Sequence, residues 1–225
     1  DANWLDDEEK ALLKVELARD GEPRAQWGLR HVFGSSRVWM LALVYFLLVM
    51  GLYGVGFWLP QLIRNTGVQD VLDIGLLTAI PYAVAVVSMI LLARSSDRHN
   101  ERRWHLAAAS IAGAAGLYAS TLCGSELVLG LIALSLGTAG VLSTMPVFWT
   151  WPSSVLAGTA AAAGIAMINS IGNLAGFVSP SIIGWMKDLT HSTNAGLWVV
   201  AVALLLGAAL ALLGSAAKAP ARMRA

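Results

Sequence analysis

The sequence predicts an all-α membrane protein, a bundle of six transmembrane helices. Of its 225 residues, 57% are hydrophobic and only 13% are charged, whereas soluble domains carry roughly 25% charged residues. The apolar residues also gather in six runs, and about 20 such residues suffice for one helical crossing of a bilayer. These runs cover residues 38–63, 74–93, 104–122, 127–149, 155–186 and 196–214.

The first 36 residues differ in kind from the six runs. In "WLDDEEKALLKVELARD", Asp6 and Glu9 have the spacing of a capping box, and good helix formers follow until Gly21 and Pro23. We expect a cytoplasmic linker with a short charged helix over residues 1–36, the bundle over 37–216 and a cytoplasmic tail over 217–225. The charged helix is either a solvated connector or a binding site for another protein.

Basic residues predict the orientation of the bundle. Thirteen of the fifteen Lys and Arg residues precede the first run, follow the sixth, or lie between the second and third, whereas Arg64 and Lys187 fall on the other side. Because Lys and Arg concentrate in cytoplasmic loops, both termini are expected in the cytoplasm of a multi-pass plasma-membrane protein.

The first run contains helix breakers and aromatic residues together. In "YFLLVMGLYGVGFWLPQLI" (residues 45–63), three glycines closely precede Trp58 and Pro60, which predicts a helix that bends. Tyr45 and Tyr53 are about two helical turns apart and point roughly the same way. Each tyrosine either packs against another helix or lines a cavity.

The fourth and fifth runs fill a stretch of sixty residues, 127–186, without one Asp, Glu, Lys or Arg. A proline and two serines near Pro152 predict a short turn between them. Trp149 and Trp151 lie between Pro146 and Pro152. The two tryptophans either belong to an interfacial aromatic belt or line a pocket where the prolines loosen the helix.

Two asparagines share one face of the fifth helix. Asn169 and Asn173 are four residues apart, with Gly172 and Gly176 close beside that face. Amides are expensive in hydrocarbon, so they either join two helices by hydrogen bonds or face a polar cavity. Uncharged polar groups of this kind suit reversible binding.

Enzyme chemistry is not expected, because an enzyme buried in a membrane still needs ionisable residues on facing helices. The runs contain almost none, and no two histidines have a metal-binding helical spacing. We therefore expect no catalytic residue, no metal and no cofactor. A net charge of +1 argues against a nucleic-acid partner.

The loop "ARSSDRHNERRWH" (residues 93–105) is the most charged internal segment, with its charges at Asp97, Arg98, Arg102 and Arg103. Ion pairs in such a loop can bias a two-state arrangement of helices. The alternative is that these charges only set the topology.

Several of these segments together resemble one family. "SDRHNERR" (96–103) resembles the Asp-Arg loop motif of the major facilitator superfamily, in the copy between the second and third helices of its C-terminal half, although Ala93 stands where glycine is usual. With "GFWLPQLI", "IGLLTAIPY" and the charge-free segment, the chain resembles the anion:cation symporter branch, which includes tartrate, phthalate and sugar-acid permeases. The resemblance covers the whole chain.

The resemblance implies helices seven to twelve of a twelve-helix carrier in the bacterial inner membrane. It implies substrate contacts from the tenth and eleventh helices at Trp149, Thr150, Asn169 and Asn173, and from the seventh helix at Tyr45, Tyr53 and Trp58. The implied function is secondary active transport of a small organic anion with protons by alternating access. The implied partners are the lipid bilayer, the anion, protons and the N-terminal six-helix half.

No predicted helix supplies an acid for proton coupling or a cation for the anion, so coupled transport by this chain alone is not expected. The alternatives are an uncoupled solute facilitator of the same architecture and a six-span structural or regulatory membrane protein.

Overall fold

The computed structural model describes residues 6–20, 33–156 and 159–214, and within these ranges the chain is helical, without a strand. The first helix is α1 (Asp7–Asp20). A reciprocal cap begins it, because the Asp6 N–H donates to Glu9 Oε2 (3.1 Å) and the Glu9 N–H donates to Asp6 Oδ1 (2.8 Å). Most of the predicted linker after α1, and the predicted tail 217–225, lie outside the described residues.

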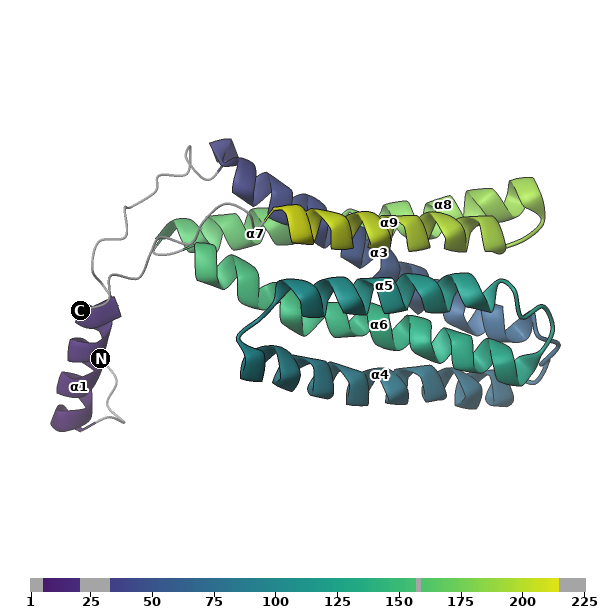
Figure 1. The fold of residues 1–225 in the computed structure, drawn as a ribbon, viewed down its shortest axis with the longest axis horizontal. Coiled ribbons are helices and arrows are strands. Elements are labelled where there is room, and N and C mark those ends of the chain that lie inside the picture. The colour runs from purple at the N-terminus through teal and green to yellow at the C-terminus, as the bar shows by residue number, and fades with distance from the viewer. Residues whose placement is uncertain (1–5, 21–32, 157–158, 215–225) are drawn as a thin grey trace.

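Six crossings follow α1, and they lie side by side in an elongated bundle (Figure 1). They are α3 (Ser36–Arg64), α4 (Val71–His99), α5 (Arg103–Ser120), α6 (Leu127–Val155), α7 (Thr159–Asn173) with α8 (Ala175–Thr190), and α9 (Asn194–Leu213). The start of α3, the α4–α5 loop and the end of α9 lie at one end, called here the loop end (Figure 1). The six-helix transmembrane bundle is therefore confirmed.

Five of the crossings are long and apolar enough to span a membrane, with α7 and α8 counted as one. The exception among the described residues is α5, because Arg103, Trp104 and His105 occupy its first turn and small residues fill the rest. Its small residues have another use, since they let α5 approach α6 closely.

Helix boundaries differ from the sequence prediction at two places. The expected turn at Pro152 is wrong, because α6 continues to Val155 and the Leu156 N–H still donates to the Pro152 carbonyl (2.9 Å). A proline removes only its own N–H, and its carbonyl remains free to accept. Lys187, expected outside the spans, lies inside α8, which ends at Thr190.

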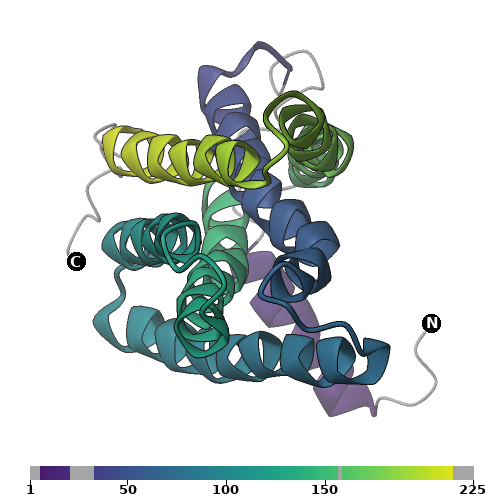
Figure 2. The ribbon, with the colours of Figure 1, turned by 90° about the vertical axis from the view of Figure 1, so that its right-hand side faces the viewer.

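Between them, α3 and α6 contact each of the other crossings, and Figure 2 shows α4 at the edge of the bundle. Leu48, Leu59, Phe148 and Leu204 are fully buried. Glycines allow the closest helix contact: a Cβ on Gly116 would lie 2.2 Å from the Gly137 nitrogen, and one on Gly140 would lie 2.2 Å from the Gly113 nitrogen. The α5 and α6 backbones therefore touch where only glycine fits.

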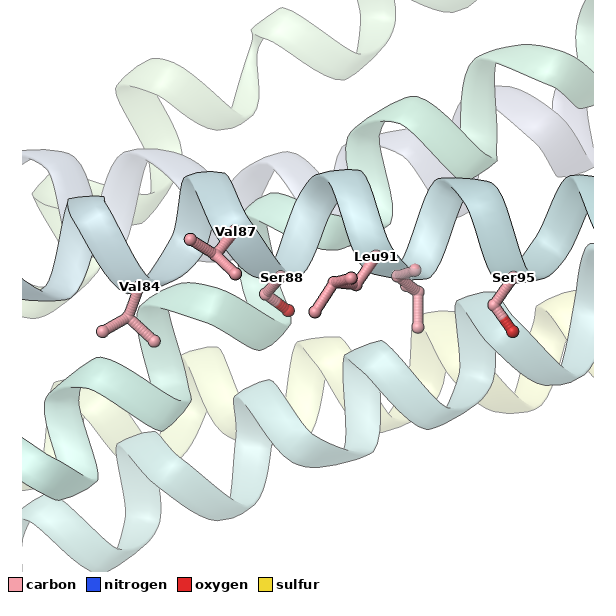
Figure 3. A pocket seen from close by; sticks show the side chains of 6 residues that line it. Val84, Val87, Ser88, Leu91 and Ser95 are labelled. Atoms are coloured by element: carbon pink, nitrogen blue, oxygen red, sulfur yellow. The ribbon is translucent and has the colours of Figure 1, made fainter.

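Much of α4 faces outward and is apolar. A groove of about 600 Å³ runs along it, and Figure 3 shows Val84, Val87 and Leu91 beside Ser88 and Ser95. Ser88 accepts a hydrogen bond from Ser143 of α6 (2.9 Å), which ties α4 to the core. Such a surface suits lipid or other apolar helices rather than a polar solute.

Candidate functional site

The eleventh-helix counterpart predicted from the resemblance is broken where its amides lie. Helix α7 ends at Asn173 and α8 begins at Ala175. At the break, the Leu174 N–H donates to the Ile171 carbonyl (3.2 Å), three residues back instead of four. A local tightening of this kind is a common place for a helix to bend.

Asn169 and Asn173 interact with each other directly before this break. The Asn173 Nδ2 donates to the backbone carbonyl of Asn169 (2.8 Å) and to its Oδ1 (2.9 Å). Both side chains are exposed on the surface of the bundle. The shared face predicted from their spacing is therefore present, and it does not point into the core of this bundle.

Tyr53 extends the two amides into a row across two helices. Its hydroxyl donates to Asn173 Oδ1 (3.1 Å), roughly midway along α3. A Cβ on Gly176 would lie 3.0 Å from the Tyr53 ring, so the glycine leaves room for that ring. Tyr53, Asn173 and Asn169 are called the polar row below.

Tyr45 lies about 12 Å from Tyr53 along α3, at the usual rise per residue, and it belongs to a separate aromatic cluster. Its ring stacks on Phe148 (centroids 4.9 Å apart, 16° between planes) and meets Trp149 edge-on (4.9 Å, 67°). A Cβ on Gly172 would lie 2.0 Å from the Tyr45 ring. Tyr45 is buried, and it connects α3 to α6 and α7 close to the polar row.

Thr150 faces a different space from the amides. With Trp151 it lines a pocket of about 630 Å³ at the loop end, formed with residues 100–104. Its hydroxyl donates to the Val147 carbonyl of its own helix (2.7 Å), as hydroxyls in apolar helices often do. Asn169, which the resemblance groups with Thr150, is not among the residues that line this pocket.

Trp58 lies toward the other end of α3, half-buried against α8. A Cβ added at Gly184 of α8 would lie 3.7 Å from the indole ring. The Lys187 ammonium lies 5.3 Å from the centre of that ring. Trp58 therefore lies apart from both the polar row and the aromatic cluster.

The charged loop forms a compact network at the loop end. Arg102 pairs with Asp97 and also donates to Ser96 Oγ (3.0 Å), while the buried Ser96 hydroxyl donates to the Glu101 carbonyl (2.7 Å). Asn100 takes the left-handed conformation (φ 49°) that ends α4. The other two residues predicted for this loop, Arg98 and Arg103, are both exposed. Arg103 is the first residue of α5.

Glu101 is a loop residue that the sequence interpretation missed. Its carboxylate accepts from the backbone N–H groups of Arg103 (2.8 Å) and Trp104 (2.9 Å), and it lies 3.1 Å from His105 Nδ1. Burial alone would raise the pKa of Glu101, but these hydrogen bonds outweigh it and hold the pKa below its usual value. A glutamate just before an apolar run was the available signal for this cap.

Comparisons with known proteins agree on one family. The family model described as the Major Facilitator Superfamily matches residues 4–180. The chain is 41% identical over 207 residues to a Pseudomonas putida protein named "Putative metabolite transport protein NicT", with 91% of this chain and 47% of that protein covered. It is 44% identical to an Agrobacterium vitis protein named "Putative tartrate transporter", with 94% of this chain and 47% of that protein covered.

A third relative is the "Quinolone resistance transporter" of Acinetobacter baumannii, 38% identical over 91% of this chain and 48% of that protein. The chain therefore spans about half the length of the curated relatives it matches.

Proposed function

The chain belongs to the major facilitator superfamily, and we propose that it is the C-terminal six-helix half of a carrier that moves a small organic anion together with a proton. Relatives named as transporters of tartrate and of a metabolite support this class of substrate. The half-length match and the six crossings support an N-terminal half of similar size. Alternating access between the two halves is the expected mechanism.

The polar row is the observation that carries this proposal. Asn169 and Asn173 are exposed on a bundle whose outer surface is otherwise largely apolar. The hydrogen bonds within the row use only part of the donor and acceptor capacity of the two amides. Polar groups in hydrocarbon are costly when that capacity is not met, so a polar cavity between two halves explains their position better than lipid does. Two amides and a phenol offer both donors and acceptors to the hydroxyl and carboxylate groups of a small acid.

The charges for proton coupling are assigned to the N-terminal half. Within the crossings of this chain, Asp73, Asp97 and Asp188 lie in first or last turns. A coupling acid has to gain and lose its proton inside the protein. In this proposal, the polar row is the uncharged side of the central site.

The orientation proposed is the one in which the loop end faces the cytoplasm of the bacterial inner membrane. The described helices support it because the start of α3 and the end of α9 lie at the same end as the arginines of the α4–α5 loop. Concentration of basic residues on one side is the usual determinant of such an orientation.

The test is uptake of tartrate, phthalate and sugar acids by proteoliposomes that hold the intact carrier, with and without an inward proton gradient. Asn169→Ala is expected to raise the KM at least about 5-fold, the equivalent of one hydrogen bond of about 1 kcal/mol, with normal expression and insertion. Asn65→Ala, at the end of α3 and outside the row, is the matched control.

Uptake at the same rate with and without the proton gradient would favour the uncoupled facilitator. No uptake of any acid, together with normal expression and membrane insertion of Asn169→Ala, would favour a structural or regulatory protein.

A further inference from the structure

Lys187 is a cation held at the edge of an apolar bundle by an aromatic ring. Because α8 continues to Thr190, Lys187 lies in its last turn, and its ammonium lies 5.3 Å from the centre of the Trp58 ring. Cations are attracted to the face of an indole at such distances. The lysine side chain is half-buried rather than extended into solvent.

Small residues of α8 bring this pair together. The Ser179 hydroxyl donates to the Met50 carbonyl of α3 (2.6 Å), and a Cβ on Gly184 would just touch the Trp58 ring at 3.7 Å. The two helices are therefore close along the segment that leads from the polar row to Lys187. The position of the ammonium follows from this packing.

Lys187 has no carboxylate within ion-pair distance in the part of the chain that the structure describes. Carboxylates are present near the same end of the bundle, but Asp70 caps α4 through the N–H groups of Leu72 and Asp73, and Asp188 is exposed. A partly buried ammonium without a counter-ion is costly. An indole face offsets part of that cost, but it does not accept hydrogen bonds from the three ammonium N–H groups as an oxygen would.

We propose that Lys187, supported on Trp58, binds a carboxylate group of the transported anion at the end opposite the loop end, before the anion reaches the polar row. This inference rests on the proposed function and adds a second anion site to it. From Lys187 to Asn173 along α7 and α8 is roughly 20 Å at 1.5 Å per residue. A four-carbon diacid is far shorter than that, so the two places are successive sites.

Chemical labelling of the intact carrier in proteoliposomes tests the site directly. An amine-acylating reagent is applied with tartrate, with phthalate, or with threitol, which keeps tartrate's carbon skeleton and hydroxyls but lacks its carboxylates. Mass spectrometry then follows acylation of Lys187, with Lys10 of α1 as the internal reference. Either acid is expected to slow acylation of Lys187 at least 3-fold, with no effect of threitol and no change at Lys10.

Substitutions test the same site through uptake. Lys187→Gln is expected to raise the KM about 10-fold, whereas Lys187→Arg, which keeps the charge and can still stack on Trp58, stays within about 2-fold of the original. Arg64→Gln removes the same charge at the same end, from an exposed residue at the end of α3, and is expected to change the KM less than 2-fold.

Equal effects of Lys187→Gln and Arg64→Gln would overturn the proposal, because they would reveal general surface attraction instead of a site. The absence of protection by both acids would overturn it as well. If the carrier takes up an acid but Lys187 is not protected, the second site is wrong and the proposed function stands. If Lys187 is protected but no acid is taken up, the site stands and the transport proposal is wrong.

Discussion

At the scale of single residues, the hydrogen bond from Tyr53 to Asn173 Oδ1 (3.1 Å) fixes the amide beside the helix break. Tyr53→Phe removes this donor but keeps the ring against Gly176. In the proposed carrier, where the amide would then be less well oriented, we expect the KM for the acid to rise about 3- to 10-fold, the range for a net hydrogen bond of about 1 kcal/mol. Uptake kinetics of the intact carrier measure this, and thermal stability is expected to change little.

Tyr118→Phe provides the matched control, because Tyr118 is an exposed tyrosine on α5, outside the polar row, with its ring near that of Trp198. An equal rise of the KM in both variants would show that the Tyr53 hydroxyl has no special role.

A second residue-scale prediction concerns Glu101, whose pKa is lowered in the folded loop. A carboxylate with a lowered pKa stabilises the folded state above its unfolded pKa, and that contribution is lost as the pH falls through the folded pKa. We therefore expect the protein to lose stability as the pH falls below about 4.5, the ordinary pKa of the group, and Glu101→Gln to flatten this part of the profile. Thermal unfolding measured from pH 7 to pH 3.5 tests it.

Glu126→Gln is a matched control for that experiment. Glu126 also precedes a helix, α6, but makes no side-chain cap there. A flattening of similar size in Glu126→Gln would mean that the Glu101 cap is not the source of the pH dependence.

At the scale of elements, hydropathy and charge predicted the crossings but not how their ends and contacts form. The number of crossings follows from composition, because about 20 apolar residues in a row have few other stable states. The path of α6 through Pro152 and the break at Leu174 depend on which carbonyls find partners, which hydropathy does not report. The face shared by Asn169 and Asn173 was predictable because it needs only the helical period.

In the candidate site as well, the residues could be predicted from the sequence but their contacts could not. Sequence reasoning named Tyr53 and Asn173 separately, but their contact joins residues 120 positions apart. It placed Lys187 in a loop because a charge normally ends a span, whereas in the structure Trp58 lies beneath that charge. Contacts between helices decided both outcomes, and no local pattern in the chain encodes them.

The α5–α6 contact gives an element-scale prediction. Gly116→Ala places a methyl group 2.2 Å from the Gly137 nitrogen, a backbone atom that cannot move aside alone. Overpacking of this kind costs about 1–3 kcal/mol and sometimes more, so we expect a clear drop in thermal stability in detergent. Gly130→Ala on α6, where the nearest side-chain atom lies at 3.8 Å, is expected to be nearly neutral. Equal stability of the two variants would contradict the close backbone contact.

At the scale of the whole molecule, the two exposed amides and the apolar groove on α4 belong to surfaces of different character on one bundle. An apolar surface can meet lipid, but the amides require a polar partner or water. The polar row can therefore bind a solute only where a second surface closes a polar cavity over it, and in the proposed carrier the N-terminal half provides that surface.

This dependence gives the last prediction. Proteoliposomes that hold the 225 residues alone are expected not to accumulate tartrate under a proton gradient, while the intact carrier does, because the crossings of this chain hold their carboxylates only in end turns. Separate expression of the N-terminal half in the same membrane is the complementing control, and it is expected to restore uptake. Accumulation by this chain alone would mean that the coupling acid lies at a helix end, with Asp73, Asp97 and Asp188 as the groups to substitute next.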